Sequence, residues 1–153
     1  MKTFLAAIFL LCSVPLLSQS KGIPPIVLEA LQPDDLKMFD TRGPHGSDCE
    51  FYFDNPNKQA NSSNMVLFLP DTLERSIPIR LNGKAIQLEL DPSHKWGPKK
   101  MRLNYAWKNG DIKVILICRH SEAGEFSEYF AGTIEVKVGN QSKTYNITGT
   151  CGC

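Results

Sequence analysis

Apolar and polar side chains alternate with a period of two through most of the chain after residue 48, and turn signals separate the alternating runs. The strongest of these signals are Asn82-Gly83 and Asn109-Gly110, because Asn-Gly tolerates the positive φ angles of a two-residue hairpin turn. Residues two apart lie on one face of a strand, so the alternation predicts half-buried antiparallel strands. No run of comparable length has the helical period. We therefore expect an all-β fold, either an antiparallel β-sandwich or a small β-barrel of about eight short strands.

Two runs depart from this alternation. Residues 65–69 (Met-Val-Leu-Phe-Leu) are apolar without interruption, which predicts a short strand buried on both faces. Pro78 lies within the run that precedes Asn82-Gly83. Because proline has no N–H to donate, we expect this strand to lie at a sheet edge or to begin late.

The N-terminus has the three parts of an export signal. Lys2 supplies a positive charge, residues 4–17 are mostly apolar, and Ser18-Gln19-Ser20 offers small residues for cleavage. The apolar run is too short for a transmembrane helix, which needs about 20 residues. We expect a signal peptide at residues 1–20, cleaved after about Ser20, and a secreted or periplasmic protein with no transmembrane segment.

The rest of the chain divides into two parts by composition. Residues 21–48 are rich in proline and glycine and are predicted to form an irregular N-terminal arm. Within the arm, residues 33–39 can form a short helical turn, because proline and two acidic residues open it. Residues 49–153 are predicted to form a single β domain stapled by disulfides.

Four of the five cysteines remain after the signal peptide is removed with Cys12, which follows a bulky leucine unsuited to lipoprotein processing. In an exported domain these four predict two disulfides. A bridge within the terminal Cys-Gly-Cys would close a very small ring near the limit of Cα separation. We therefore expect Cys151 and Cys153 to reach distant partners, one of them Cys49 and the other Cys118, with roughly 2–4 kcal/mol from each bridge. The alternation places all four thiols on the apolar faces of their strands.

The net charge of the chain bears on which partners it can attract over long range. The full chain has a formal net charge of +1, and removal of Lys2 with the signal peptide leaves zero. Such a balance gives no long-range attraction to nucleic acid or to an anionic membrane. We therefore expect no nucleic-acid partner, and a charged partner would have to meet a local patch.

The most suggestive local patch is a basic stretch around a tryptophan, residues 94–102. Tryptophan can stack on a sugar, a base or an apolar partner while nearby cations hold an anionic group. In the alternative interpretation the tryptophan packs under the sheet and the lysines only keep the loop hydrated. The candidate binding residues are Lys95, Trp96, Lys99, Lys100 and Arg102.

Motifs for catalysis and for metal binding are absent from the sequence. It has no Gly-x-Ser-x-Gly elbow, phosphate loop or His-Glu-x-x-His, and the histidines His45, His94 and His120 lack metal-ligand spacing. We therefore expect no enzyme, no cofactor and no metal site. Two alternatives stay open. Cys151 and Cys153 could act as a metal-binding or redox pair, or loop histidines could assemble an active site with a carboxylate.

Several short motifs carry a resemblance. They are the Asp-Cys-Glu-Phe at 48–51, the Leu-Asn-Gly-Lys at 81–84, the Asn-Gly-Asp at 109–111 and the C-terminal Gly-x-Cys-Gly-Cys. Over residues 48–153 the chain resembles small exported bacterial proteins of uncharacterised function, a likeness that implies no activity. In architecture it is similar to exported bacterial lysozyme inhibitors of the small β-barrel type. The basic stretch around Trp96, on an otherwise neutral chain, predicts a non-enzymatic binding module for a protein or a cell-envelope glycan. Inhibition of a cell-wall hydrolase is an alternative.

Overall fold

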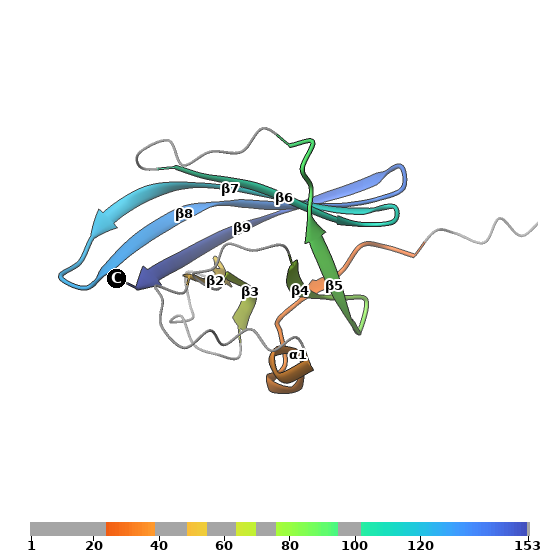
Figure 1. Cartoon of the computed structure of the whole chain (residues 1–153), viewed down its shortest axis with the longest axis horizontal. Coiled ribbons are helices and arrows are strands. Elements are labelled where there is room, and N and C mark those ends of the chain that lie inside the picture. The colour runs from red at the N-terminus through yellow and green to blue at the C-terminus, as the bar shows by residue number, and fades with distance from the viewer. Residues whose placement is uncertain (1–23, 39–48, 55–63, 70–75, 95–101, 153) are drawn as a thin grey trace, which may run out of the picture.

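The computed structural model of the chain describes residues 24–38, 49–54, 64–69, 76–94 and 102–152. Their elements, in chain order, are β1 (Leu28–Glu29), α1 (Pro33–Met38), β2 (Cys49–Phe53), β3 (Met65–Leu69), β4 (Ser76–Leu81), β5 (Lys84–Leu90), β6 (Arg102–Asn109), β7 (Ile112–Ala123), β8 (Ser127–Val138) and β9 (Gln141–Gly152). These strands form one antiparallel sheet in the order β1-β4-β5-β6-β7-β8-β9-β2-β3. The expected all-β class is confirmed. The sheet curls into a nearly closed barrel, with β6–β9 forming a layer of long strands above β2–β5 (Figure 1).

Three tight turns join consecutive strands. Asn82 (φ 49°) and Gly83 (φ 78°) connect β4 to β5, as the Asn-Gly pair predicts. Gly110 (φ 59°) opens the turn between β6 and β7, and Gly139 (φ 56°) opens the turn between β8 and β9. Positive φ at these positions suits glycine and matches the twist of a hairpin. Each of these turns therefore makes two strands that are consecutive in sequence neighbours in the sheet.

Pro78 lies inside β4, opposite Gln87 of β5. On the other side of β4, the short β1 pairs only with Arg80 and Leu81. Pro78 therefore lies beyond the end of β1, where the described residues give β4 a single ladder partner. This position agrees with the edge location expected for a residue that has no N–H to donate.

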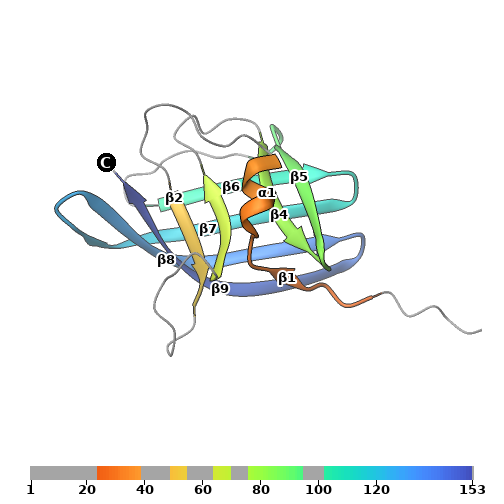
Figure 2. The same ribbon diagram turned by 90° about the horizontal axis from the view of Figure 1, so that it is seen from below.

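Residues 24–38 close the seam between the two ends of the sheet. β1 pairs with the end of β4, and the N–H of Leu31 donates to the carbonyl of Met65 in β3 at 2.7 Å. The segment thus supplies the first strand of the sheet order, β1, and also bonds to the last strand, β3. Helix α1 lies between β3 and β4 (Figure 2). The expected irregular arm is, in its described part, an ordered piece of the barrel, with Ile26 and Leu28 buried in the main core.

Helix α1 begins as its sequence predicts. Pro33 is its first residue, and the carboxylate of Asp35 accepts the backbone N–H of Gln32 at 2.8 Å, which satisfies a free donor at the helix start. Arg80 Nη1 of β4 binds the same carboxylate at 3.0 Å. The helix is therefore held against the barrel by a buried acid. Within the described residues, no helix has the length and apolar content that a membrane crossing requires.

The barrel interior is filled by the inward residues of the alternating runs. The largest fully buried side chains include Phe51, Leu67, Ile79, Leu88, Leu116, Ile134 and Ile147. All five residues of β3 are buried, as the continuous apolar run predicts. Two of them, Met65 and Phe68, belong to a second cluster outside the barrel, which Leu36 of α1 partly covers. Burial on both faces therefore results from the core on one side and the N-terminal segment on the other.

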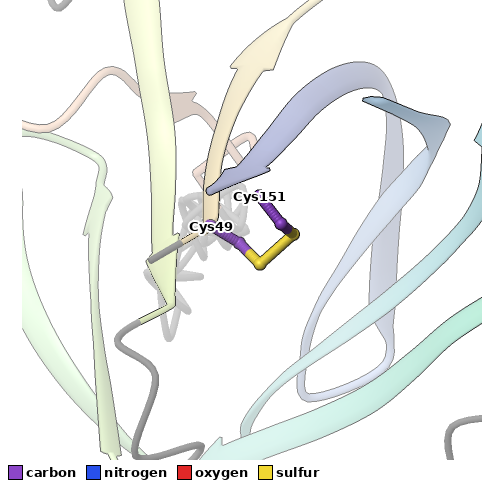
Figure 3. Close-up of a disulfide and its surroundings, with 2 residues drawn as sticks. All are labelled: Cys49 and Cys151. Atoms are coloured by element: carbon purple, nitrogen blue, oxygen red, sulfur yellow. A yellow bond between two sulfur atoms is a disulfide. The ribbon is translucent and has the colours of Figure 1, made fainter. Parts of the chain in front are cut away.

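Cys49 and Cys151 form a disulfide at the ends of β2 and β9 (Figure 3). The two residues are direct partners in the antiparallel ladder, with Cα atoms 4.0 Å apart, and they are separated by 102 positions in sequence. Both pack against the main core, as the alternation predicts. The expected bridge from a C-terminal cysteine to Cys49 is thus confirmed, and it ties the last strand to β2.

The expected disulfide at Cys118 is wrong. Cys118 is a free thiol and is fully buried. It lies opposite Gly132 of β8, which in turn lies opposite Ile147 of β9. Cys151 is further along β9, roughly 13 Å beyond Ile147 at the rise of a strand, so Cys118 lies out of disulfide range of it. Cys153, the other candidate partner, lies outside the described residues.

Candidate functional site

The basic stretch predicted to bind a ligand is described only at its two ends. His94 Nε2 lies 2.9 Å from Asn104 Oδ1 of β6. Arg102 is the first residue of β6, is exposed, and lies opposite Arg119 of β7. The other predicted binding residues lie outside the described residues, namely Lys95, Trp96, Lys99 and Lys100.

Asp91 anchors the chain where it enters this stretch. It is 2% exposed, and its carboxylate lies 2.9 Å from Lys113 Nζ, 3.2 Å from Lys108 Nζ and 2.7 Å from Ser93 Oγ. The bond from Lys113, followed by those from Ser93 and Lys108, holds the pKa of Asp91 far below its usual range and outweighs the opposing effect of burial. These neighbours satisfy the carboxylate, so its role is to fix the chain just after β5, where it leads into the basic stretch.

A groove of about 280 Å³ lies on the outer face of the barrel, where β2, β7, β8 and β9 are adjacent. The residues that give it its chemical character are Tyr52, Glu122, Tyr129, Ala131, Thr148 and Thr150. They come from segments far apart in sequence. The ladders β2–β9 and β8–β9 bring them together.

The floor of the groove is low because its residues are small. Ala131 and Thr148 are direct partners across β8 and β9, and Thr148 is also the partner of Tyr52 in β2. Side chains in such a row are separated by about 4.8 Å, so two small residues leave a space beside the larger tyrosines. Gly149 is required beneath them, since a Cβ there would collide with the ring of Phe51 in the core.

The two tyrosines of the groove have different roles. Tyr52 is 8% exposed, and its O–H donates to the carboxylate of Glu50. Burial first, and then the bond to Glu50 and its charge, raise the pKa of Tyr52 well above its ordinary value, so the phenol stays protonated. Tyr129 is 42% exposed, and its ring is accessible to a ligand. The groove therefore combines one fixed ring, one accessible ring, threonine hydroxyls and the exposed carboxylate of Glu122.

The row that crosses the groove continues into two arginines. Arg102 is the partner of Arg119, Arg119 is the partner of Ala131, and Ala131 is the partner of Thr148. Of the five candidate binding residues in the basic stretch, Arg102 is the one that the structure describes. It therefore lies in register with the groove, on the strand two positions away from β8.

The described residues offer little to a metal or redox site. Cys151 is held in a disulfide, and burial raises the pKa of the Cys118 thiol to about 12, which keeps it protonated. Within the described part of the chain, no three histidine, cysteine, aspartate or glutamate side chains form a cluster that could hold a metal ion. His94 bonds to Asn104, whereas His120 packs edge-on against Phe130. His45 lies outside the described residues.

No protein-family model, curated protein or solved structure matches the chain. The groove therefore has to be interpreted from its own chemistry. The sequence does not predict it, because the register of β2 with β9 is needed to bring Tyr52 to Thr148. One signal is nevertheless present: Tyr129 lies on the face of its strand opposite to buried Phe130 and Ile134, where an aromatic residue has no core to fill.

Proposed function

We propose that the protein is a non-enzymatic binding module of the secreted or periplasmic compartment, and that the groove across β2, β7, β8 and β9 holds a cell-envelope glycan. The accessible ring of Tyr129 beside a floor of small residues is the observation that carries the proposal. A sugar has an apolar C–H face that packs on an aromatic ring and hydroxyls that bond to polar side chains. Thr148, Thr150 and Glu122 place such polar groups around the ring.

The location outside the cytoplasm rests on two features that agree. The Cys49–Cys151 disulfide is typical of oxidising compartments, and residues 1–20 have the pattern of an export signal. N-terminal sequencing of the protein recovered from the medium or the periplasm is expected to begin at Lys21. A protein that retains Met1 would contradict export by cleavage.

Retention on purified cell envelope tests the glycan site. We expect the protein to be retained by envelope that has been treated with protease, and to be released when periodate destroys the sugar diols. Tyr129→Ala should abolish most of the retention. Phe126→Ala is the matched control, because Phe126 is an exposed aromatic (72%) that does not line the groove. Equal retention of Tyr129→Ala and the wild type would refute the groove, and loss of retention after protease treatment would indicate a protein partner.

The basic stretch is a second contact region in this proposal. Lys95, Trp96, Lys99, Lys100 and Arg102 would bind an anionic part of the ligand. Replacing Trp96 and Lys99 together by alanine should weaken retention with little change in the melting temperature. Unchanged retention would restrict the site to the groove.

Inhibition of a cell-wall hydrolase is the second candidate function. The observation that favours it is Phe126, which is 72% exposed at the tip of the β7–β8 hairpin beside the acidic Glu125. Such a tip can enter the cleft of a basic enzyme. Excess protein should then slow lysis of bacterial cells by lysozyme, and Phe126→Ala should remove the effect. Unchanged lysis rates would reject this function.

A further inference from the structure

Arg102 and Arg119 lie directly opposite each other on neighbouring strands, and both are exposed on the outer face of the sheet. Like charges at such positions repel each other and destabilise the pairing. Among the described residues, neither arginine has an ion pair or a side-chain hydrogen bond that would offset this repulsion. Arg80, by comparison, binds Asp35 at 3.0 Å. A cost to folding without a local partner often marks a functional position.

The place of this pair relative to the groove suggests what it binds. Arg119 is the direct partner of Ala131, and Ala131 is the direct partner of Thr148 on the groove floor. Neither arginine lines the groove itself. At about 4.8 Å per strand, Arg119 lies one strand away from the Ala131 of the groove floor, and Arg102 lies one strand further out. Ala131 has no long side chain to separate the guanidinium groups from the space beside Tyr129. A ligand lying in the groove can therefore extend toward both arginines.

Guanidinium groups bind carboxylates through two parallel N–H···O bonds, which makes them selective for a planar anion. The remaining lining supplies aromatic rings, hydroxyls and the carboxylate of Glu122, and these groups suit the C–H face and the hydroxyls of a sugar. The ligand carboxylate is therefore placed at the arginines, on the side of Ala131, and not beside Glu122. We propose that Arg102 and Arg119 give the groove a preference for saccharides that carry a carboxylate, such as uronic acids. This inference rests on the proposed function and specifies the class of its ligand.

A pair of saccharides that differ only in charge tests the inference by titration calorimetry. The probes are an oligogalacturonate and the same oligosaccharide after reduction of its carboxyl groups to hydroxymethyl groups. The wild type should bind the uronate about tenfold more tightly, in line with hydrogen bonds to charged groups, and salt should reduce this preference. The double variant Arg102→Gln, Arg119→Gln should bind the two probes equally. Lys84→Gln with Lys143→Gln removes two exposed charges that do not line the groove and should keep the preference.

The outcomes separate this inference from the proposed function. Equal binding of the two probes by the wild type, or an unchanged preference in the arginine variant, overturns the carboxylate site while the glycan groove stands. Binding of neither probe also overturns it. The glycan groove itself is decided by the retention of Tyr129→Ala on protease-treated envelope, which does not depend on the charge of the sugar.

Discussion

The two faces of strands β2, β8 and β9 have different roles: the inner face packs in the core and the outer face forms the groove. Their inner faces carry Phe51, Ile134 and Ile147, which are fully buried in the barrel. Their outer faces carry Ala131 and Thr148, which are small and leave a groove. A sheet with one face in the core and one in solvent can therefore keep stability and binding on alternate residues of the same strand. The two properties should respond to different substitutions.

The largest loss of stability is expected on the inner face. Phe51→Ala removes a fully buried ring and should lower the free energy of unfolding by about 3–5 kcal/mol. Urea unfolding followed by tryptophan fluorescence measures it. On the outer face, Tyr129→Ala should stay within about 0.5 kcal/mol of the wild type. Comparable losses of unfolding free energy in Phe51→Ala and Tyr129→Ala would contradict the separation of stability and binding between the two faces.

The Cys49–Cys151 disulfide stabilises the barrel by joining the ends of β2 and β9. Replacing both cysteines by serine should lower the free energy of unfolding by roughly 2–5 kcal/mol, because the bridge closes a loop of 102 residues in the unfolded chain. Alkylation followed by peptide mapping measures the reactivity of the free thiol of Cys118. Cys118 should react only after unfolding, since burial raises its pKa to about 12. Rapid labelling of Cys118 in the native protein would contradict its position in the core.

The ionised carboxylate of Asp91 makes the stability of the fold depend on pH. Its folded-state pKa is lowered from 3.8, so its stabilising effect is present above about pH 4 and is lost as the pH falls below that value. Asp91→Asn should lower the melting temperature by several degrees at pH 7, and the difference from the wild type should shrink below pH 4. Asp34→Asn is the control, because Asp34 is exposed in its pair with Lys37. A difference that stays constant with pH would refute the role of the ionised carboxylate.

The smallest change in the free energy of unfolding is expected on the outer face, and it is a gain where the preceding substitutions cause losses. Arg119→Gln removes the repulsion with Arg102 and should raise the free energy of unfolding by about 0.2–0.5 kcal/mol. Arg80→Gln should lower it, because Arg80 binds the buried Asp35. Differential scanning calorimetry of the two variants measures both changes. A loss of stability in Arg119→Gln would show that this arginine has a structural partner.

The parts of the fold that depend on local sequence could be predicted. Alternation identified the strands, and Asn82-Gly83 forms the hairpin turn with both residues at positive φ. Parity also placed Cys49 and Cys151 toward the core. Parity alone gives a face and not a height along the barrel, however. It therefore cannot show that Cys118 is a free thiol and that the register places it out of reach of Cys151.

Features that depend on contacts between distant segments could not be predicted in this way. The N-terminal segment looks irregular in sequence because its two-residue strand is defined by pairing with β4, and its role appears only when Leu31 bonds to β3. The groove likewise requires Tyr52 to meet Thr148 across the β2–β9 ladder. The basic stretch was visible in sequence because its charges are consecutive, and the groove was not because its residues are dispersed.

Amide chemical-shift mapping tests the central claim most directly, since it locates a ligand on one face without any substitution. The labelled protein would be titrated with glycan fragments released from protease-treated envelope. We predict that the largest shifts occur at Tyr129, Ala131, Thr148 and Thr150, with small shifts at the distant turn of Asn82 and Gly83. Shifts confined to residues outside the groove, or no saturable shifts at all, would contradict the account.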